Sequence, residues 1–377
     1  MDDSALFQAL QDNQQDPQPT AVATIVSIDG PAYRGLGTQI AIRANAPVYG
    51  TISAGCLEND VRRHAELCFQ DQRVHRVTYD ATNDDELIWG MGTGCGGRIE
   101  IQITPLFDPA QTALLSWIEA VQQRRASGAF LQEIVADGAE AAGLCWLDGK
   151  GVTPAFPTSS LPSAAVIDMA MARLDRDGSD RRGRRPALLE EPSARWLFRP
   201  AAPPPAVLLV GAGSDVAPLI TGFAGLGWQV EVIDHRPDQR DPNRYPAATW
   251  LTAERAKDFA ARPAHRRDFA AAVIKGHHFE RDAAWLAAVL KEAIPYVGVL
   301  GPRSRFERLV AHLAEQGTRF DAEQCARVYA PTGLDLGGEN PAEVALSVVA
   351  EVMKETHRRT GAPLREKKGP IHERGSH

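Results

Sequence analysis

The stretch AVLLVGAGSDVAPL, residues 206–219, decides the fold of the C-terminal half of the chain. Its first five residues form an uninterrupted apolar run, which is typical of a strand buried in a parallel sheet. Gly211-Ala212-Gly213 follows at once, and a helical pattern begins after it. Strand, glycine turn and helix in this order predict a Rossmann-type fold. Gly211 would allow the tight turn, and Gly213 would let the backbone approach a pyrophosphate.

An acidic residue completes this pattern. Asp234 ends the next apolar stretch, WQVEVID, about 20 residues further on, where the ribose-binding acid of a dinucleotide fold belongs. Arg236 follows closely and would suit a 2′-phosphate, so the choice between NAD and NADP stays open. Val216 occupies the third glycine position of the motif. The same turn also occurs in proteins where it has a structural role and binds no nucleotide.

Residues 206–356 continue as short apolar strands alternating with amphipathic helices. This alternation predicts an α/β fold with a parallel sheet and helices on both faces. His277 and His278 follow the predicted strand AAVIK and would lie at the carboxyl edge of the sheet, where ligands bind in such folds. They are candidate proton carriers, and the alternative is that they are solvated residues before a helix.

The N-terminal residues 1–109 are predicted to form a small α/β domain. AVATIVSI (21–28) reads as a strand, and RIEIQITPL (98–106) alternates as a half-buried strand does. A helix is expected from about Leu57, with Val61, Ala65 and Cys68 on one face. Residues 110–205 form a poorly patterned middle that ends in a proline-rich linker, and residues 357–377 are expected to be a disordered tail.

The composition of the chain argues against several classes of function. The 377 residues carry 41 Lys and Arg against 48 Asp and Glu, a net charge of -7, which argues against nucleic acid as the main partner. The N-terminus does not resemble a signal peptide, and no apolar run approaches the roughly 18 residues of a membrane span. A cytoplasmic protein is therefore expected. The five cysteines contain no C-x-x-C pair, so a metal site cannot be assigned.

Two glycine-rich loops each contain a cysteine. Gly55 and Cys56 lie in GTISAGCLE, and Gly94, Cys95 and Gly96 lie in GMGTGCGG. Small neighbours leave a backbone and a thiol accessible to a ligand, whereas a free cysteine is often just a small buried hydrophobe. Two such loops in one domain favour function. The other three cysteines are interpreted as packing residues: Cys68, Cys145 and Cys325.

These motifs in this order resemble the XdhC/CoxI family, the accessory factors of xanthine dehydrogenase and related molybdenum hydroxylases. The resemblance covers nearly the whole chain. Tyr33, where the family commonly has proline, and Ala54, where it has glycine, are modest departures. The motifs that carry it are ATIVSIDGPAYRGLGTQIAI, GTISAGCLE, GCGG, VLLVGAGSDVAPL, VIDHRP, HHFERDAAWLAAVL, YVGVLGPRSRFERL and APTGLDLGGENPAEVALSVVAEV.

The resemblance implies a chaperone that binds the molybdenum cofactor (molybdopterin), supports its sulfuration by a cysteine desulfurase and inserts it into a xanthine-dehydrogenase-like enzyme. Arg34 would pair with the cofactor's phosphate, and Cys56 or Cys95 would face the metal or the sulfur. Two alternatives stay open. One is an NAD(P)-dependent oxidoreductase that uses Gly211, Gly213 and Asp234, and the other is a sulfur-transfer protein with a cysteine persulfide. A homodimer is expected because two-fold assemblies are the commonest.

Overall fold

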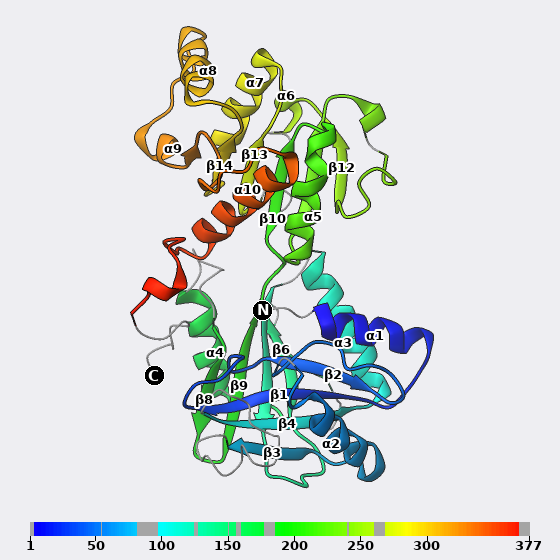
Figure 1. The fold of residues 1–377 in the computed structure, drawn as a ribbon. Helices are drawn as coiled ribbons and strands as arrows, with labels where there is room; N and C mark the ends of the chain where they lie inside the picture. Colours follow the sequence, from blue (N-terminus) through cyan, green and yellow to red (C-terminus); the bar gives the residue numbers. More distant parts are fainter. Residues whose placement is uncertain are drawn as a thin grey trace. The chain divides into compact units, whose positions relative to one another are not determined.

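A computed structural model describes residues 4–53, 55–80, 97–123, 127–149, 151–155, 160–176, 185–239, 241–259 and 268–368. The chain divides into two compact units, Met1–Pro203 and Pro204–His377 (Figure 1). The elements of the first unit are α1 (Ser4–Gln15), β1 (Thr20–Asp29), β2 (Gln39–Arg43), α2 (Glu58–Asp71), β3 (His75–Asp80), β4 (Arg98–Leu106), α3 (Asp108–Gln122), β5 (Gly128–Ile134), β6 (Leu144–Asp148), β7 (Gly151–Pro154), α4 (Ala164–Arg176), β8 (Ala187–Glu191) and β9 (Ala194–Ala201).

The first four strands form an antiparallel sheet, sheet A, in the order β2-β1-β4-β3. Helix α2 covers one face of it and begins at Glu58, one residue after the predicted start. Its buried residues are the predicted Val61, Ala65 and Cys68, so the helical period was read correctly. They pack against buried isoleucines of β1 and β4, and each large apolar side chain so buried contributes roughly 1.5–3 kcal/mol.

The second face of sheet A is also covered, which changes the interpretation of RIEIQITPL. Gln102 and Thr104 are buried, although alternation predicts that they face solvent. The Gln102 amide donates to the Glu133 carbonyl at 2.9 Å and accepts from the Val135 amide at 3.0 Å. A polar residue can be buried when its hydrogen bonds are satisfied, so β4 lies inside the unit rather than on its surface.

The middle region, predicted to be irregular, contains a second antiparallel sheet. Its strand order is β7-β6-β5-β9-β8, with α4 packed against it. These strands are short, and several are apolar on both faces, as in β6 and β9. They show no clean alternation for the sequence to reveal. Residues 202–205 follow β9 without regular structure and lead into the second unit.

The second unit contains the predicted Rossmann-type sheet. Its six strands are parallel, in the order β12-β11-β10-β13-β14-β15, and this prediction is confirmed. The elements are β10 (Ala206–Val210), η2 (Ser214–Val216), α5 (Ala217–Gly225), β11 (Gln229–Asp234), η3 (Pro237–Gln239), β12 (Trp250–Ala253), α6 (Ala256–Phe259), β13 (Ala271–Ile274), α7 (Phe279–Leu290), β14 (Val297–Val299), α8 (Arg303–Glu315), α9 (Ala322–Ala326), β15 (Val328–Tyr329), α10 (Pro341–Thr356) and η5 (Leu364–Glu366).

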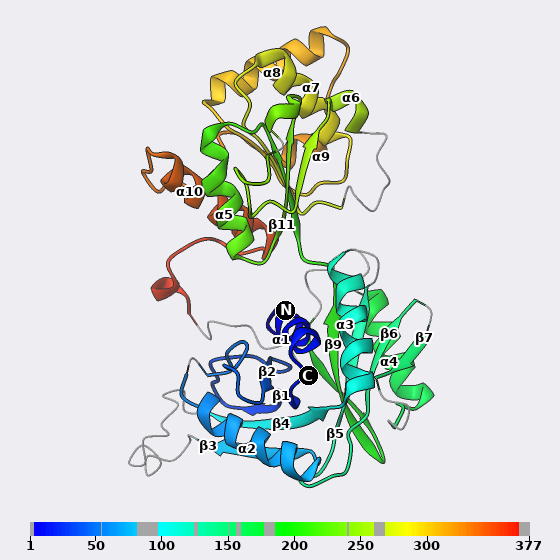
Figure 2. The same cartoon turned by 90° about the vertical axis from the view of Figure 1, so that its right-hand side faces the viewer.

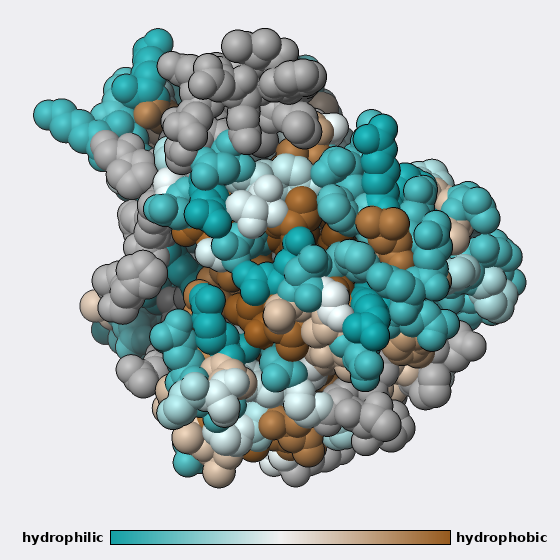
Figure 3. Space-filling view, turned by 90° about the horizontal axis from the view of Figure 1, so that it is seen from below, coloured by the Kyte–Doolittle hydropathy of each residue, from teal (hydrophilic) through white to brown (hydrophobic). Residues whose placement is uncertain are grey.

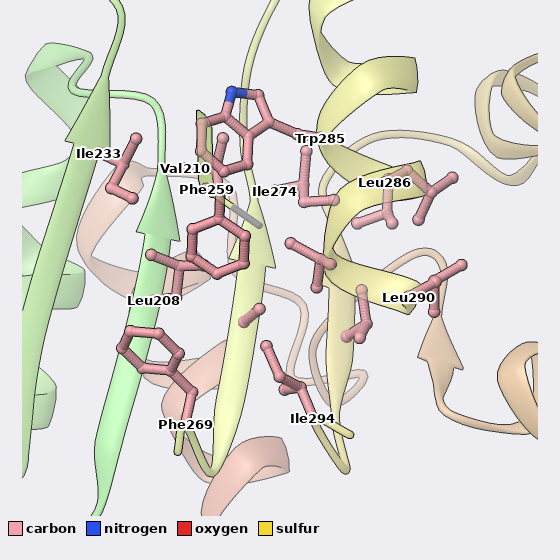
Figure 4. Packing of buried hydrophobic residues seen from close by; sticks show 14 of the residues in the cluster. Leu208, Val210, Ile233, Phe259, Phe269, Ile274, Trp285, Leu286, Leu290 and Ile294 are labelled. Carbon is pink, nitrogen blue, oxygen red and sulfur yellow. The ribbon is translucent and has the colours of Figure 1, made fainter. Parts of the chain in front are cut away.

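Helices cover both faces of this sheet, and each face has its own core. Helices α5 and α10 pack on one face, while α6, α7 and α8 pack on the other (Figure 2). On the second face, side chains of β10 and β13 interdigitate with those of α7 and with Phe259 and Phe269 (Figure 4). The two cores hold the carboxyl ends of β10, β11 and β13 in fixed register. The turns that follow those strands therefore start from a rigid edge.

Hydrophilic residues dominate the face of the molecule in Figure 3, with apolar residues gathered near its middle. Within the ranges that the structure describes, no helix is both long enough and apolar enough to cross a membrane. Part of the predicted disordered tail also has structure, because Leu364–Glu366 forms a turn of 3₁₀-helix.

Candidate functional site

Several predicted features of the first unit lie at one end of sheet A, called here the loop end. It is defined by residues 29–34, 50–53, 55–60, 79–80 and 97–98. The Tyr79 hydroxyl donates to Asp60 in the first turn of α2 at 2.7 Å, which places the start of that helix at the end of β3. Strand pairing sets Arg98 opposite both Asp29 and Asp80. The turn after β1, the start of α2, the end of β3 and the start of β4 therefore lie at the same end of the sheet.

A close backbone approach joins two of these features. A Cβ atom added to Gly97 would lie 2.0 Å from the carbonyl oxygen of Pro31. Any side chain at this position would clash with that carbonyl, so only glycine allows the residue before β4 to lie so close to the turn after β1. Gly94, Cys95 and Gly96 lie just before it and outside the described residues, so their predicted role stays a prediction.

The loop before α2 is organised by one carboxylate that the sequence analysis did not single out. Glu58 Oε1 accepts from the Thr51 hydroxyl at 2.7 Å and from the amides of Ile52 and Ser53 at 2.9 and 3.0 Å. Oε2 accepts from the Ser53 hydroxyl at 2.6 Å and the Gly55 amide at 2.9 Å. Burial would raise the pKa of Glu58, but these hydrogen bonds outweigh it and lower the pKa to about 2.

The thiol presented by this loop is accessible. Cys56 is exposed, whereas Cys68 and Cys145 are buried, and burial raises the pKa of each of those two thiols to about 12. The packing interpretation is therefore right for Cys68 and Cys145. It is wrong for Cys325, which is exposed on the short helix α9. Cys56 is the exposed thiol among the described residues of the first unit.

Arg34 is also exposed, in the turn after β1. Its guanidinium lies 5.6 Å from the centre of the Tyr33 ring, a cation–π contact that does not use its N–H donors. The turn is bounded by Gly30 and Gly37, both with positive φ. A guanidinium binds anionic groups and a thiol binds soft metal or sulfur centres, and both kinds of group are exposed at this end of the sheet.

In the second unit the glycine turn has the predicted shape. Gly211 has φ +105°, a conformation that favours glycine, and it approaches Gly276 at the end of β13. Asp234 ends β11 as expected, but its oxygens are already used. They accept from the Ala212 amide at 2.9 Å and from the Arg236 side chain at 2.9 Å through both Nε and Nη2. Burial would raise the pKa of Asp234, yet these bonds keep it well below its ordinary value.

An ion pair that the sequence analysis missed lies above the glycine turn. Lys275 Nζ donates to Asp215 Oδ1 at 2.6 Å, with the lysine side chain 1% exposed and the aspartate side chain 30% exposed. The available signal was a lysine directly after the apolar strand AAVI and an acid just beyond Gly213. Both positions follow neighbouring parallel strands, so their side chains meet at one edge.

His277 and His278 are exposed at this carboxyl edge, as predicted, and His278 precedes the first turn of α7. Burial would raise the pKa of Asp215, but the hydrogen bond and the charge of Lys275 outweigh it and lower that pKa, with a smaller contribution from nearby His277. Arg305, in the first turn of α8, forms an ion pair with Asp282. Among the described residues, no group of three His, Cys, Asp or Glu side chains could hold a metal ion.

Fold and sites together define a two-unit α/β protein: a thiol-presenting loop in an antiparallel N-terminal unit, and a Rossmann-type C-terminal unit. Residues 14–80 match the XdhC and CoxI family, and residues 207–352 match the XdhC Rossmann domain family. The chain belongs to the XdhC and CoxI family. The predicted family is thus confirmed.

Three relatives show the extent of the likeness. The chain is 26% identical over 344 residues to a probable xanthine dehydrogenase subunit of Bacillus subtilis (strain 168), covering 90% of this chain and 94% of the relative. It is 28% identical over 150 residues to the uncharacterized protein YqeB of Escherichia coli (strain K12), or 40% of this chain and 27% of the relative. A crystal structure of a xanthine dehydrogenase from Bacillus halodurans matches with TM-score 0.74 and 25% identity, over 95% of this chain and 98% of that one.

Proposed function

We propose that this protein is an accessory factor that binds the molybdenum cofactor and inserts it into a xanthine-dehydrogenase-like molybdenum hydroxylase. The observation that carries the proposal is the loop end of sheet A, where a loop anchored by Glu58 presents the exposed Cys56 and the turn after β1 presents the exposed Arg34. Two relatives are named as xanthine dehydrogenase or its subunit, which supports an enzyme of that class as the partner.

The residues present fit such a cofactor. Molybdopterin carries a phosphate and dithiolene sulfurs that hold the metal. A guanidinium binds phosphate through paired N–H groups, and a thiolate is a ligand for soft metal and sulfur centres. Arg34 and Cys56 offer these two groups. When bound, the cofactor supplies the metal centre with which the target enzyme hydroxylates its substrate, and this chain's residues only hold and orient it.

Sulfuration is the finer part of the proposal. An exposed cysteine at the site could accept sulfur from a cysteine desulfurase, and Cys56 meets the requirement of accessibility. A sulfur-transfer protein acting through a persulfide would use the same residue. Bound pterin separates these two functions, since a transfer protein needs none. The expected homodimer stays a prediction.

An NAD(P)-dependent oxidoreductase is the weaker alternative. The ribose of a dinucleotide would need the carboxylate of Asp234, which instead accepts hydrogen bonds from Arg236 and Ala212. A pyrophosphate at Gly213 would meet the carboxylate of Asp215, a like charge.

The proposal is tested by purifying the full chain from a host that makes molybdopterin. We expect molybdenum and pterin to copurify in near-stoichiometric amounts and to activate apo-xanthine dehydrogenase. Absence of pterin, together with hydride exchange on a nicotinamide, would support the oxidoreductase instead. Absence of pterin with a cyanide-labile sulfur on the protein would support sulfur transfer.

Replacing Cys56 by alanine should lower the retained cofactor at least fivefold, because the exposed thiol at the loop end is lost. Cofactor per chain is measured by pterin fluorescence after purification. Cys325→Ala is the matched control, since it removes an exposed thiol from the second unit and should leave retention unchanged. Cys95→Ala is measured in parallel. Full retention and full activation of the hydroxylase by both the Cys56 and the Cys95 variants would contradict the proposal.

A further inference from the structure

Helix α10 of the second unit has an exposed apolar flank that the proposed function does not use. The helix packs beside α5, where Ala345, Val348 and Val352 belong to the core of that face of the sheet (Figure 2). On a neighbouring flank, Leu346 is 63% exposed and Met353 is 41% exposed. Large apolar side chains that are exposed together, rather than singly, are typical of a surface that binds another molecule.

This flank, called here the α10 surface, consists of Ala342, Leu346, Ala350 and Met353. Successive members are four, four and three residues apart, which keeps them on one side of a helix with 3.6 residues per turn. None of the four is charged. Small and large side chains alternate along the surface, so that each leucine or methionine projects next to the shallow space over an alanine.

Exposed leucines lie in the segments just before and just after α10. Leu336 is 56% exposed and Leu364 is 63% exposed. The segment before the helix lies alongside it, because the Leu334 amide donates to the Ser347 carbonyl at 3.3 Å and the Ser347 hydroxyl donates to the Leu334 carbonyl. The segment after it also returns to the helix, since a Cβ on Gly361 would lie 3.2 Å from a side-chain carbon of α10. Apolar exposure is therefore concentrated around this one helix.

The α10 surface is complementary in size to a second copy of itself. If two such helices pack antiparallel about a two-fold axis, Leu346 lies opposite Ala350 of the other copy, and Met353 lies opposite Ala342. Each large side chain then meets a small one, as close packing of two helices requires. A two-fold interface uses the same patch on both chains, so it needs this kind of self-complementarity.

The charges at the two ends of α10 favour the same arrangement. Glu339 and Glu343 are exposed at the N-terminal end, and Arg358 and Arg359 are exposed just beyond the C-terminal end. Antiparallel packing sets the acidic end of one helix against the basic end of the other, and it also pairs their dipoles favourably. Parallel packing would set like charges against each other.

We propose that a second copy of this chain binds at the α10 surface, with the two α10 helices antiparallel about a two-fold axis. Helix α10 has 16 residues and is therefore about 24 Å long. A single helix flank of this length buries less than the roughly 800 Å² per partner of a standard interface. Leu336 and Leu364 are thus expected to contribute, and the dimer should dissociate in the micromolar range. The proposal does not depend on the cofactor site of the first unit.

Sedimentation velocity of the full chain, over a concentration series that spans the micromolar range, tests the proposal. Wild type should pass from monomer to dimer as its concentration rises. Leu346→Glu should raise the dimer Kd at least tenfold, because it places a charge at the centre of the apolar interface. Leu67→Glu is the matched control, since it makes the same change at an exposed leucine of helix α2 and should leave the Kd unchanged.

Cross-linking tests the direction of the two helices. A mixture of the Leu346→Cys chain with the Ala350→Cys chain should form a covalent dimer under mild oxidation several-fold faster than either chain alone, because these two positions face each other in the antiparallel pair. The other cysteines are the same in every sample and contribute equally. Faster cross-linking of either chain with itself would show that like positions face each other, and it would overturn the proposal.

Thermal unfolding checks that Leu346→Glu is folded. If it is not, Leu346→Ala replaces it, since alanine favours the helix and removes only the projecting side chain, and it should raise the Kd at least threefold. The proposal is overturned if wild type is monomeric throughout the series, or if the folded Leu346 variant dimerises as wild type does. A monomeric wild type that binds apo-xanthine dehydrogenase through Leu346 would assign the α10 surface to that enzyme instead.

Discussion

Glu58→Gln is expected to destabilise the first unit by about 2–3 kcal/mol and to abolish cofactor retention. The carboxylate accepts five hydrogen bonds from Thr51, Ile52, Ser53 and Gly55. A glutamine has one acceptor oxygen, and its NH₂ group would face donors. A donor left unsatisfied costs roughly 1–3 kcal/mol. Hydrogen exchange of α2 amides measures the local loss of stability, and copurified pterin measures retention.

The effect should depend on pH in a defined direction. The folded-state pKa of Glu58 is about 2, below the ordinary value of 4.5. The ionised carboxylate therefore stabilises the loop above about pH 4.5, and this contribution is lost as pH falls toward 2. Wild type and Glu58→Gln should converge in stability over that window. Glu66→Gln, an exposed position on the same helix, is the control and should change stability by less than about 0.5 kcal/mol at any pH. Equal losses in both variants would show that Glu58 has no special role.

Sequence patterns predicted the helices and strands in which buried residues recur at a regular spacing or form one continuous run. Strands β10, β13 and β14 are buried throughout and α2 is buried along one face, so the apolar runs and the Val61, Ala65 and Cys68 stripe could be read directly. The second sheet of the first unit was not predicted, because strands such as β6 and β9 are buried on both faces and therefore show no alternation. Burial of Gln102 likewise depends on distant partners, the Glu133 carbonyl and the Val135 amide.

The candidate sites also divide into residues that sequence spacing located and contacts that it did not predict. Gly211 and Asp234 were found because their spacing along the chain reflects local geometry. The bond from the Ala212 amide to Asp234 and the pairing of Lys275 with Asp215 join segments that are 22 and 60 residues apart in the chain. Spacing does not encode such pairings, and a carboxylate such as Glu58 looks like any acidic residue in the first turn of a helix. A motif thus locates a site, while the three-dimensional contacts decide what it can bind.

Gly97→Ala is expected to destabilise the first unit by about 3 kcal/mol and to displace the turn that carries Arg34. The added Cβ would lie 2.0 Å from the Pro31 carbonyl oxygen and 2.9 Å from that of Asp29. Both are backbone atoms that cannot rotate away, and overpacking of this kind typically costs roughly 1–3 kcal/mol. Relief requires that β4 or the turn after β1 moves. Urea unfolding and hydrogen exchange of β1 measure the loss, and pterin retention reports the position of Arg34.

Gly35→Ala is the matched control, because it adds the same methyl group to the same turn. A Cβ at Gly35 would meet nothing within 4 Å. That substitution should change stability by less than about 0.5 kcal/mol, as open surface positions do. If both variants lose cofactor with stability unchanged, the turn acts through flexibility rather than through its contact with Gly97. If Gly97→Ala is as stable as wild type and retains cofactor, the close approach is not needed to hold Arg34 at the loop end.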